Sequence, residues 1–228
     1  MIIAKVRLNR SPGAQGSLAK VLLTGSNSDQ SHGLVWTLFN HVEHDDERKD
    51  RDFLYREIEP GSFIVVANTP PLDPHGLWVI DKPKDYAIEV SAGDRLSFVL
   101  RANPVVAVPR PGEKRGSRAD AIMHAKTKLP VAERKNFTAN DASKIAVQWL
   151  ARRGPQLGFE LDTEATSADG YRQVRISSAS GKPAIVYSEI EFTGALSVTD
   201  PDLLRHALYN GIGKARAYGC GLMLIRRA

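Results

Sequence analysis

The sequence contains a single cysteine, Cys220, and no apolar stretch long enough to cross a bilayer. One thiol cannot form an intrachain disulfide, and it cannot supply a zinc site built from several thiolates. The first ten residues alternate apolar and polar side chains, so they lack the apolar core of a signal peptide. These absences predict a cytoplasmic protein that does not associate with a membrane.

What the sequence does contain is enough apolar material for a core and a modest basic excess. With 228 residues, 42% of them hydrophobic, the chain can form one ordinary domain or two small ones that share an interface. Its 31 lysines and arginines exceed its 26 aspartates and glutamates, which gives a net charge of +5. This excess permits a polyanionic partner without proving one.

The first half of the sequence alternates strand and helix signals. A strand pattern opens the chain, and apolar residues at helical spacing (Val35, Trp36 and Phe39) follow several candidate N-caps. Pro60-Gly61 separates two apolar runs and predicts a hairpin. The expected order is that of a ferredoxin-like βαββαβ unit, with strands at 2–8, 53–58, 63–67, 86–90 and 95–102 and a helix at 29–40.

The second half begins with a turn-forming, basic stretch, residues 105–139, that predicts a linker or mobile loop. A capped amphipathic helix from residue 140 ends at Gly154-Pro155, and a second helix lies between Asp200-Pro201 and Asn210-Gly211. Strand patterns cover 171–177, 185–198 and 222–225. The sequence therefore predicts two small α+β units.

A glycine-rich segment, Gly211 to Leu222, precedes the last strand. Glycines allow positive φ and close approach of a ligand, and the exposed N–H groups of such a loop can hold phosphate. The segment is not a dinucleotide fingerprint, because Arg216 occupies the third glycine position, and it is not a P-loop, because Ala215 follows Lys214. It is either a tight connection between a helix and a strand or a phosphate contact made by Lys214 and Arg216.

His32 is the histidine best placed for catalysis. It falls in the first turn of the predicted helix, where the positive end of the helix dipole lowers the pKa of an imidazole and keeps it neutral. A neutral imidazole can act as a general base. The same spacing aligns His32 with Val35 and Trp36, so it can equally border the core.

Two other clusters have a functional and a plain interpretation. His41 and His44, close to two aspartates, have a spacing that suits a metal site, but a solvated helix end explains them better. Arg152 and Arg153 follow a helix, where they can clamp phosphate or balance the negative end of the helix dipole.

Taken together, these segments resemble the CasE (Cse3) family, the CRISPR repeat-processing endoribonucleases of type I-E systems. The resemblance lies in His32 followed by Trp36, Leu38 and Phe39, in Arg101-Ala102-Asn103-Pro104, in Trp149 to Arg153, and in Phe192, Gly194 and Leu196 leading to Gly211-Ile212-Gly213 and Gly219-Cys220-Gly221-Leu222. It implies an α+β fold of two tandem ferredoxin-like (RAMP-type) units, residues 1–104 and 140–228, joined by the basic linker 105–139.

The resemblance also implies an activity. Members of the family bind the repeat stem-loop of precursor crRNA, and cut at the 3′ base of the stem without a metal or cofactor. The 2′-hydroxyl attacks and leaves a 2′,3′-cyclic phosphate and a 5′-hydroxyl, and the enzyme stays on its product with the other subunits of Cascade. The alternative is a non-catalytic RNA-binding subunit that protects a guide RNA end. A third interpretation is a binder of small phosphate compounds.

By the same resemblance, His32 falls on the catalytic histidine of the family. Some relatives carry tyrosine where this chain has Asp29, and lysine or histidine where it has Thr37. The candidates for those roles here are Lys214, Arg216 and Tyr218, and without such a group the protein would cleave slowly or only bind RNA. The catalytic set predicted is His32, Lys214 and Tyr218. The predicted RNA-binding set is Arg101, Lys114, Arg115, Arg118, Arg152, Arg153, Gly211, Gly213, Lys214, Arg216, Gly219 and Gly221, and no metal ligand is expected.

Overall fold

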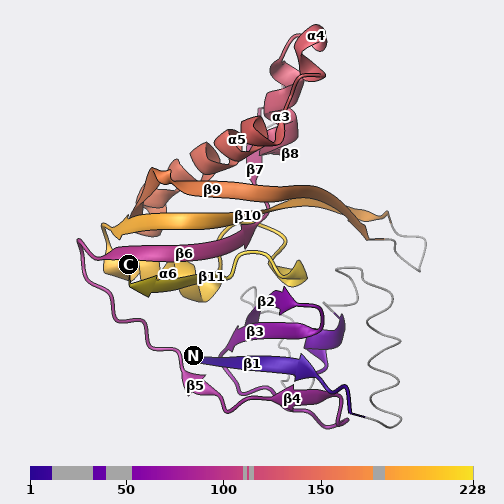
Figure 1. The fold of residues 1–228 in the computed structure, drawn as a ribbon, viewed down its shortest axis with the longest axis vertical. Coiled ribbons are helices and arrows are strands. Elements are labelled where there is room, and N and C mark those ends of the chain that lie inside the picture. The colour runs from indigo at the N-terminus through magenta and orange to yellow at the C-terminus, as the bar shows by residue number, and fades with distance from the viewer. Residues whose placement is uncertain (12–32, 40–52, 110–111, 113–115, 177–182, 228) are drawn as a thin grey trace.

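The structure, a computed structural model, describes residues 1–11, 33–39, 53–109, 112, 116–176 and 183–227. They form two larger antiparallel sheets, which lie one above the other in Figure 1, and a separate two-stranded sheet. No helix in these ranges is both long and apolar enough to span a membrane. His32, Lys114 and Arg115 lie outside the described residues, as do both ends of the helix expected at 29–40.

The first sheet has the strand order β2-β3-β1-β4, with β5 also pairing with β1. Its strands are β1 (Ile2–Leu8), β2 (Phe53–Glu59), β3 (Ser62–Ala67), β4 (Trp78–Ile80) and β5 (Lys84–Asp85). The expected hairpin is confirmed: β2 and β3 pair across Pro60-Gly61, where Gly61 has a φ of 73°. Residues 33–36, between β1 and β2 in the chain, are helical, as the sequence predicts.

The second sheet has the order β11-β6-β10-β9. Its elements are β6 (Arg95–Ala102), α5 (Ala139–Ala151), β9 (Phe159–Ile176), β10 (Ile185–Val198), α6 (Pro201–Asn210) and β11 (Met223–Arg227). In chain order they read βαββαβ, and each neighbouring pair is antiparallel, which is the ferredoxin-like arrangement. The predicted α+β class with two tandem ferredoxin-like units is confirmed.

Arg95–Ala102 is the main difference from the sequence prediction. The sequence pattern predicts that it closes the first unit, but it pairs with β10 and β11 and so begins the second sheet, ahead of the expected limit at residue 104. Its alternating burial shows one buried face without indicating which sheet it joins. Residues 86–90, also expected as a strand, have no regular secondary structure.

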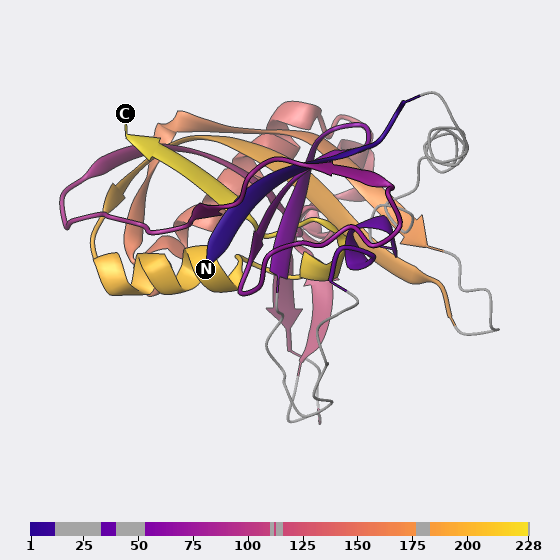
Figure 2. The same cartoon turned by 90° about the horizontal axis from the view of Figure 1, so that it is seen from below.

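The expected linker contains regular structure. β7 (Val105–Val108) pairs with β8 (Ser117–Asp120), and α3 (Ala121–Lys128) and α4 (Val131–Arg134) follow. The side chain of Asp120 accepts hydrogen bonds from the N–H groups of Ile122 and Met123, which caps the start of α3. Figure 2 shows the β7-β8 hairpin projecting away from the two larger sheets.

Capping residues fix the two long helices of the second unit. Thr138 and Asp141 form a capping box at the start of α5. Asp200 caps α6, which has a proline in its first turn, as the sequence predicted. The described residues also contain two short 3-10 helices, η1 (Gly154–Leu157) and η2 (Arg216–Tyr218).

Each unit has its own core, and a small apolar cluster joins them. In the first unit Phe39 stacks on Phe53 with ring centroids 4.3 Å apart, so the segment 33–39 covers one face of the sheet. The opposite face contributes Leu54 and Val66, which pack with Leu222 of the second unit. The two units are therefore in direct contact.

We expect Phe39→Ala to lower the free energy of unfolding by about 3 kcal/mol, because it removes a fully buried ring from the first core. Urea denaturation followed by tryptophan fluorescence measures the change. Val131→Ala, at an apolar residue that is 77% exposed, is the control and should cost less than about 0.5 kcal/mol. Equal effects of the two substitutions would contradict this packing.

Candidate functional site

The segment Gly211–Leu222, called here the glycine loop, connects α6 to β11. Its base is closed by backbone hydrogen bonds: the N–H of Gly221 donates to the carbonyl of Arg101 at 2.7 Å, and that of Ile212 donates to the carbonyl of Gly221 at 2.9 Å. A single β-bridge joins Lys214 to Asn103. The loop is therefore attached to the end of β6.

The outer part of the loop lies against β2 of the first unit. The Tyr55 hydroxyl donates to the carbonyl of Ala217 at 2.9 Å. A Cβ at Gly219 would lie 3.1 Å from the Tyr55 ring, and one at Gly211 would lie 2.9 Å from the Leu54 side chain. Both glycines have positive φ, so close approach and backbone conformation each favour glycine there.

The glycines predicted to bind RNA differ in exposure. Gly219 and Gly221 are buried, whereas Gly211 and Gly213 are half-buried. A Cβ at Gly213 would meet the Asn103 carbonyl and the Trp149 ring at ordinary contact distances, and its φ is 86°. The nearest neighbours of these four glycines are thus other residues of this chain. The sequence alone did not predict these contacts.

The cationic and aromatic side chains of the loop also differ. Lys214 is exposed. Arg216 donates to the carbonyl of Asn210, and a Cβ added at Gly211 or Gly221 would lie 3.0 Å from its side-chain carbons, so it braces the loop internally. Tyr218 stacks on Tyr187 of β10, with centroids 5.2 Å apart and an interplanar angle of 20°.

A hollow of about 420 Å³ lies beside Lys214, where the loop, the β7-β8 hairpin and β10 meet. Arg118 and Gln173, both exposed, line it together with Tyr187. The one carboxylate in its lining, Asp120, already caps α3 and accepts a hydrogen bond from Tyr171 at 2.8 Å. Two cations and an amide around a hollow of this size suit a phosphate-bearing ligand.

The two arginines that follow α5 differ in their exposure to solvent. Arg152 is exposed. Arg153 lies over the Trp149 ring, 4.3 Å from its centroid, and donates to the Val105 carbonyl at 2.9 Å. Burial lowers the pKa of Arg153, with a further contribution from Arg152. Arg153 thus joins α5 to β7, while Arg152 stays exposed, with its Nε donating to the Gln148 carbonyl at 3.2 Å.

Arg101 belongs to a polar cluster that sequence reasoning missed. Its Nε donates to Glu191 at 3.2 Å, and Glu191 also accepts from Arg56 of the first sheet. Glu189, two residues earlier on β10, is buried and pairs with Arg172. Two glutamates two residues apart, on the same face of a predicted strand, were the available signal, because buried carboxylates need cationic partners.

Thr37, five residues after His32, is half-buried beside Trp78 of the first core. The Thr37 hydroxyl accepts a hydrogen bond from Trp78 Nε1 at 3.0 Å and donates one to the Leu34 carbonyl at 2.7 Å. The position where some relatives carry lysine or histidine is therefore occupied by a structural threonine. Asp29, His41 and His44 lie outside the described residues.

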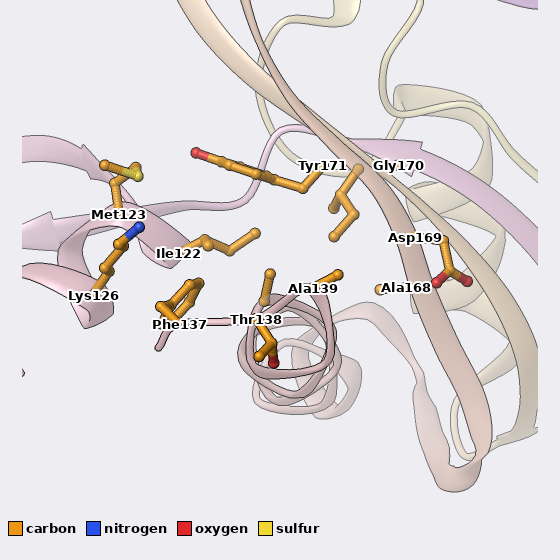
Figure 3. A pocket seen from close by; sticks show the side chains of 12 residues that line it. Ile122, Met123, Lys126, Phe137, Thr138, Ala139, Ala168, Asp169, Gly170 and Tyr171 are labelled. Atoms are coloured by element: carbon orange, nitrogen blue, oxygen red, sulfur yellow. The ribbon is translucent and has the colours of Figure 1, made fainter. Parts of the chain in front are cut away.

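A second, apolar pocket of about 380 Å³ lies between α3, the start of α5 and β9 (Figure 3). Ile122, Phe137 and Tyr171 line it, and its only charged lining residues are Lys126 and Asp169. It therefore has a single cation in its lining, whereas Arg118 and Lys214 both line the first hollow. Across the part of the chain that the structure describes, no three His, Cys, Asp or Glu residues cluster as metal ligands would.

Comparison with known proteins identifies relatives across nearly the whole chain. The family model described as CRISPR associated protein matches residues 1–227. The chain is 26% identical over 215 residues to the CRISPR system Cascade subunit CasE of Escherichia coli, covering 90% of this chain and 96% of CasE. It is 28% identical over 183 residues to the CRISPR-associated endoribonuclease Cse3 of Thermus thermophilus, covering 75% of each.

Solved structures share the fold. Cse3 of Thermus thermophilus, bound to an RNA that represents a pre-cleavage complex, superposes with a TM-score of 0.67 at 24% identity over 99% of this chain and 98% of that one. Cas6e of Escherichia coli superposes with a TM-score of 0.56 at 20% identity over the full length of both. The chain belongs to the CRISPR-associated protein family that includes CasE and Cse3.

Proposed function

We propose that this protein is an endoribonuclease that cuts the repeat stem-loop of precursor crRNA and then remains on the product with the other subunits of Cascade. Its membership of the CasE and Cse3 family over residues 1–227 carries this proposal. The names of its relatives support it, since one is an endoribonuclease and the other a Cascade subunit. The basic surface around Lys214 and Arg118 provides a region suited to a polyanion.

The proposed reaction takes its nucleophile from the substrate and needs no metal ion. His32 removes the proton of the 2′-hydroxyl that precedes the scissile phosphate. The 2′-oxygen then bonds to phosphorus as the bond from phosphorus to the 5′-oxygen breaks, and the leaving oxygen takes up a proton. The products are a 2′,3′-cyclic phosphate and a 5′-hydroxyl.

The contact between the units supports a site near the glycine loop. Phe39, Phe53 and Tyr55 lie on one face of the first sheet, with ring centroids 4.3 Å apart in the first pair and 6.4 Å apart in the second. The Tyr55 hydroxyl reaches the loop at Ala217. The segment that follows His32 and the loop that carries Lys214 are thus held to the same strand, β2.

Within the loop, exposure favours Lys214 as the group that contacts the reacting phosphate. Its ammonium can stabilise the negative charge that develops on the phosphorane. Arg216 already donates to the Asn210 carbonyl, and its proposed role is to shape the loop. Tyr218, stacked on Tyr187, remains the candidate proton donor to the leaving oxygen.

For binding, we propose that the stem lies along the exposed cations outside the loop. Arg118 projects from β8 beside the hollow, and Lys114 and Arg115 precede that strand in the sequence. Double-stranded RNA is recognised mainly through shape and phosphates, for which such side chains are suited. Arg152 extends the basic surface, whereas Arg153 and Arg101 are engaged within the protein.

We expect His32→Ala to lower the single-turnover cleavage rate of the cognate repeat hairpin by at least about 100-fold, because the general base is lost. The dissociation constant for a hairpin with a 2′-deoxy nucleotide before the cut should stay within about threefold, since binding rests on phosphate contacts. His75→Ala, at an exposed histidine of a turn, is the matched control.

Unchanged cleavage by the His32 variant would remove this residue from the mechanism. A wild-type protein that binds the hairpin without cutting it would favour the non-catalytic alternative. Cleavage should also persist in EDTA, and its loss there would point to a metal site.

We expect Lys214→Ala to reduce the cleavage rate by about 100-fold, because it removes a cation from the charge that develops in the transition state. If Lys214 also contacts a phosphate in the bound state, the slope of log Kd against log salt should fall by about one. Titrations of the 2′-deoxy hairpin at several salt concentrations measure this slope. Lys84→Ala, on β5 of the first sheet, is the control, and an equal loss of activity in both variants would argue against a specific role.

A further inference from the structure

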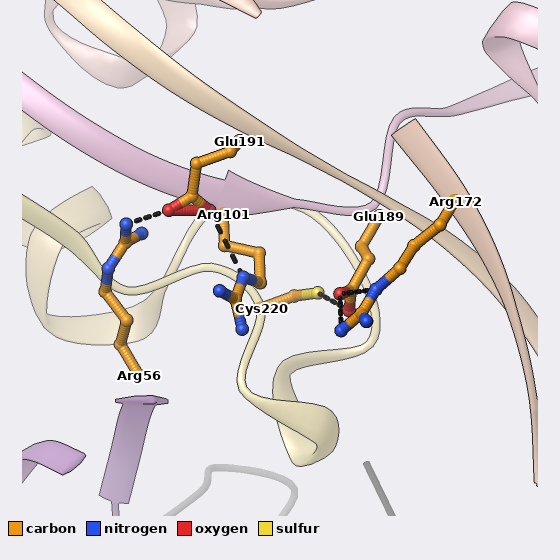
Figure 4. A network of polar contacts seen from close by, with 6 residues as sticks. All are labelled: Arg56, Arg101, Arg172, Glu189, Glu191 and Cys220. Atoms are coloured by element: carbon orange, nitrogen blue, oxygen red, sulfur yellow. Dashed lines mark hydrogen bonds and ion pairs between the residues drawn. The ribbon is translucent and has the colours of Figure 1, made fainter. Parts of the chain in front are cut away.

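Next to the glycine loop lies a group of ionic side chains, called here the charge cluster, that connects the two sheets (Figure 4). Glu191 of β10 accepts hydrogen bonds from Arg56 of β2 and Arg101 of β6. Beside it, Glu189 of β10 pairs with Arg172 of β9 at 2.6 Å. Glu191 is thus the member of the cluster whose partners come from both units.

Arg56 depends strongly on this carboxylate. The residue is 8% exposed, and its Nη1 atom has no hydrogen-bond partner within the described residues. Burial lowers the pKa of Arg56, and the Arg101 charge lowers it further, whereas Glu191 opposes both effects. Without Glu191, Arg56 would lose the carboxylate paired with it while the like charge of Arg101 remained nearby, a costly arrangement at a buried residue.

Arg101 occupies the complementary position in the second unit. Although burial alone would lower the pKa of Arg101, the carboxylates of Glu191 and Glu189 outweigh it and raise this pKa. The backbone carbonyl of Arg101 accepts from the N–H of Gly221, the bond that closes the base of the loop. The same residue therefore joins the charge cluster through its side chain and the glycine loop through its backbone.

The first unit has a corresponding pair of contacts. Arg56 enters the cluster, and its neighbour Tyr55 donates to the carbonyl of Ala217 in the loop. The stretch from Ala217 to Gly221 is consequently held by β2 at one end and by β6 at the other. The distance between these two strands is set partly by Glu191, which binds an arginine from each.

We propose that Glu191 is a positioning residue: by bridging Arg56 and Arg101 it fixes the first unit against the glycine loop, and so sets the place of Lys214 relative to the segment that follows His32. The proposal rests on the proposed nuclease function for its catalytic consequence. Its structural consequence, a loop held closed by a bridge between the sheets, is independent of that function.

The test is Glu191→Gln, which keeps the size of the side chain and removes its charge. We expect the single-turnover rate at saturating protein to fall by about 10-fold, because a small displacement of reacting groups is costly. The dissociation constant for the 2′-deoxy hairpin should change by less than about threefold, since phosphate contacts carry the binding. Amide hydrogen exchange in a peptide covering residues 217–221 should become about 10-fold faster, since local opening becomes easier.

Arg56→Gln combined with Glu191→Gln tests whether the effect passes through the arginine. The double variant removes the buried guanidinium and lets two amides pair, so we expect it to cleave faster than Glu191→Gln alone. Asp162→Asn, which breaks an ion pair with Arg95 on the second sheet, is the matched control. It should change neither the cleavage rate nor the amide exchange at residues 217–221. If Glu191→Gln fails to fold, Arg56→Gln alone should show the same faster exchange.

The outcomes separate this proposal from the proposed function. Wild-type rate and wild-type exchange in Glu191→Gln would overturn the positioning role and leave the nuclease proposal intact. If the wild-type protein cuts no hairpin, the nuclease proposal fails, and exchange at residues 217–221 alone decides whether Glu191 holds the loop. Faster exchange with an unchanged cleavage rate would overturn the link to Lys214.

Discussion

The contact between the glycine loop and β2 is the constraint on which the rest of the site depends. The loop belongs to the second unit, yet the carbonyl of Ala217 accepts its hydrogen bond from Tyr55 of the first. Gly219 must lack a side chain for this approach, since a Cβ there would press on the Tyr55 ring. A site that combines groups from both units therefore requires this contact to be close and fixed, and the glycines allow it where larger residues would separate the sheets.

Local signals were sufficient for most individual elements. Helix α6 was predicted from its cap at Asp200 and the proline that follows it. Helix α5 was predicted from its apolar spacing and a cap expected at Asn140-Asp141; in the structure the N-cap is Thr138, and the helix ends at Ala151, before the expected stop at Gly154. The hairpin around Gly61 was also predicted from local residues. The assignment of Arg95–Ala102 failed because the choice of sheet partner is a long-range property. An alternating strand buries one face equally well in either sheet, and only its pairing with β10 and β11 decides.

The candidate site was predictable as a set of residue types and less so as an arrangement. The segment around Lys214 was identified from its glycines and charges, but the sequence could not distinguish an exposed lysine from an arginine that bonds to its own loop, as Arg216 does. Likewise Arg153 has the same charge as Arg152 and lies over Trp149. Glu191 was missed because a bridging role depends on strands from separate parts of the chain that only the fold brings together.

The charge cluster explains how the basic glycine loop can pack next to several partly buried arginines. Three arginines, Arg56, Arg101 and Arg172, face two glutamates, Glu189 and Glu191, so the layer retains one excess positive charge. Full neutralisation would lower the cost of burial, but it would also remove the positive potential on which the proposed binding of a phosphodiester at Lys214 relies. The carboxylates on β10 bind the arginines, and neither Glu189 nor Glu191 lines the hollow beside Lys214. The same ionic groups can thus join the two units and leave the exposed face of the loop basic.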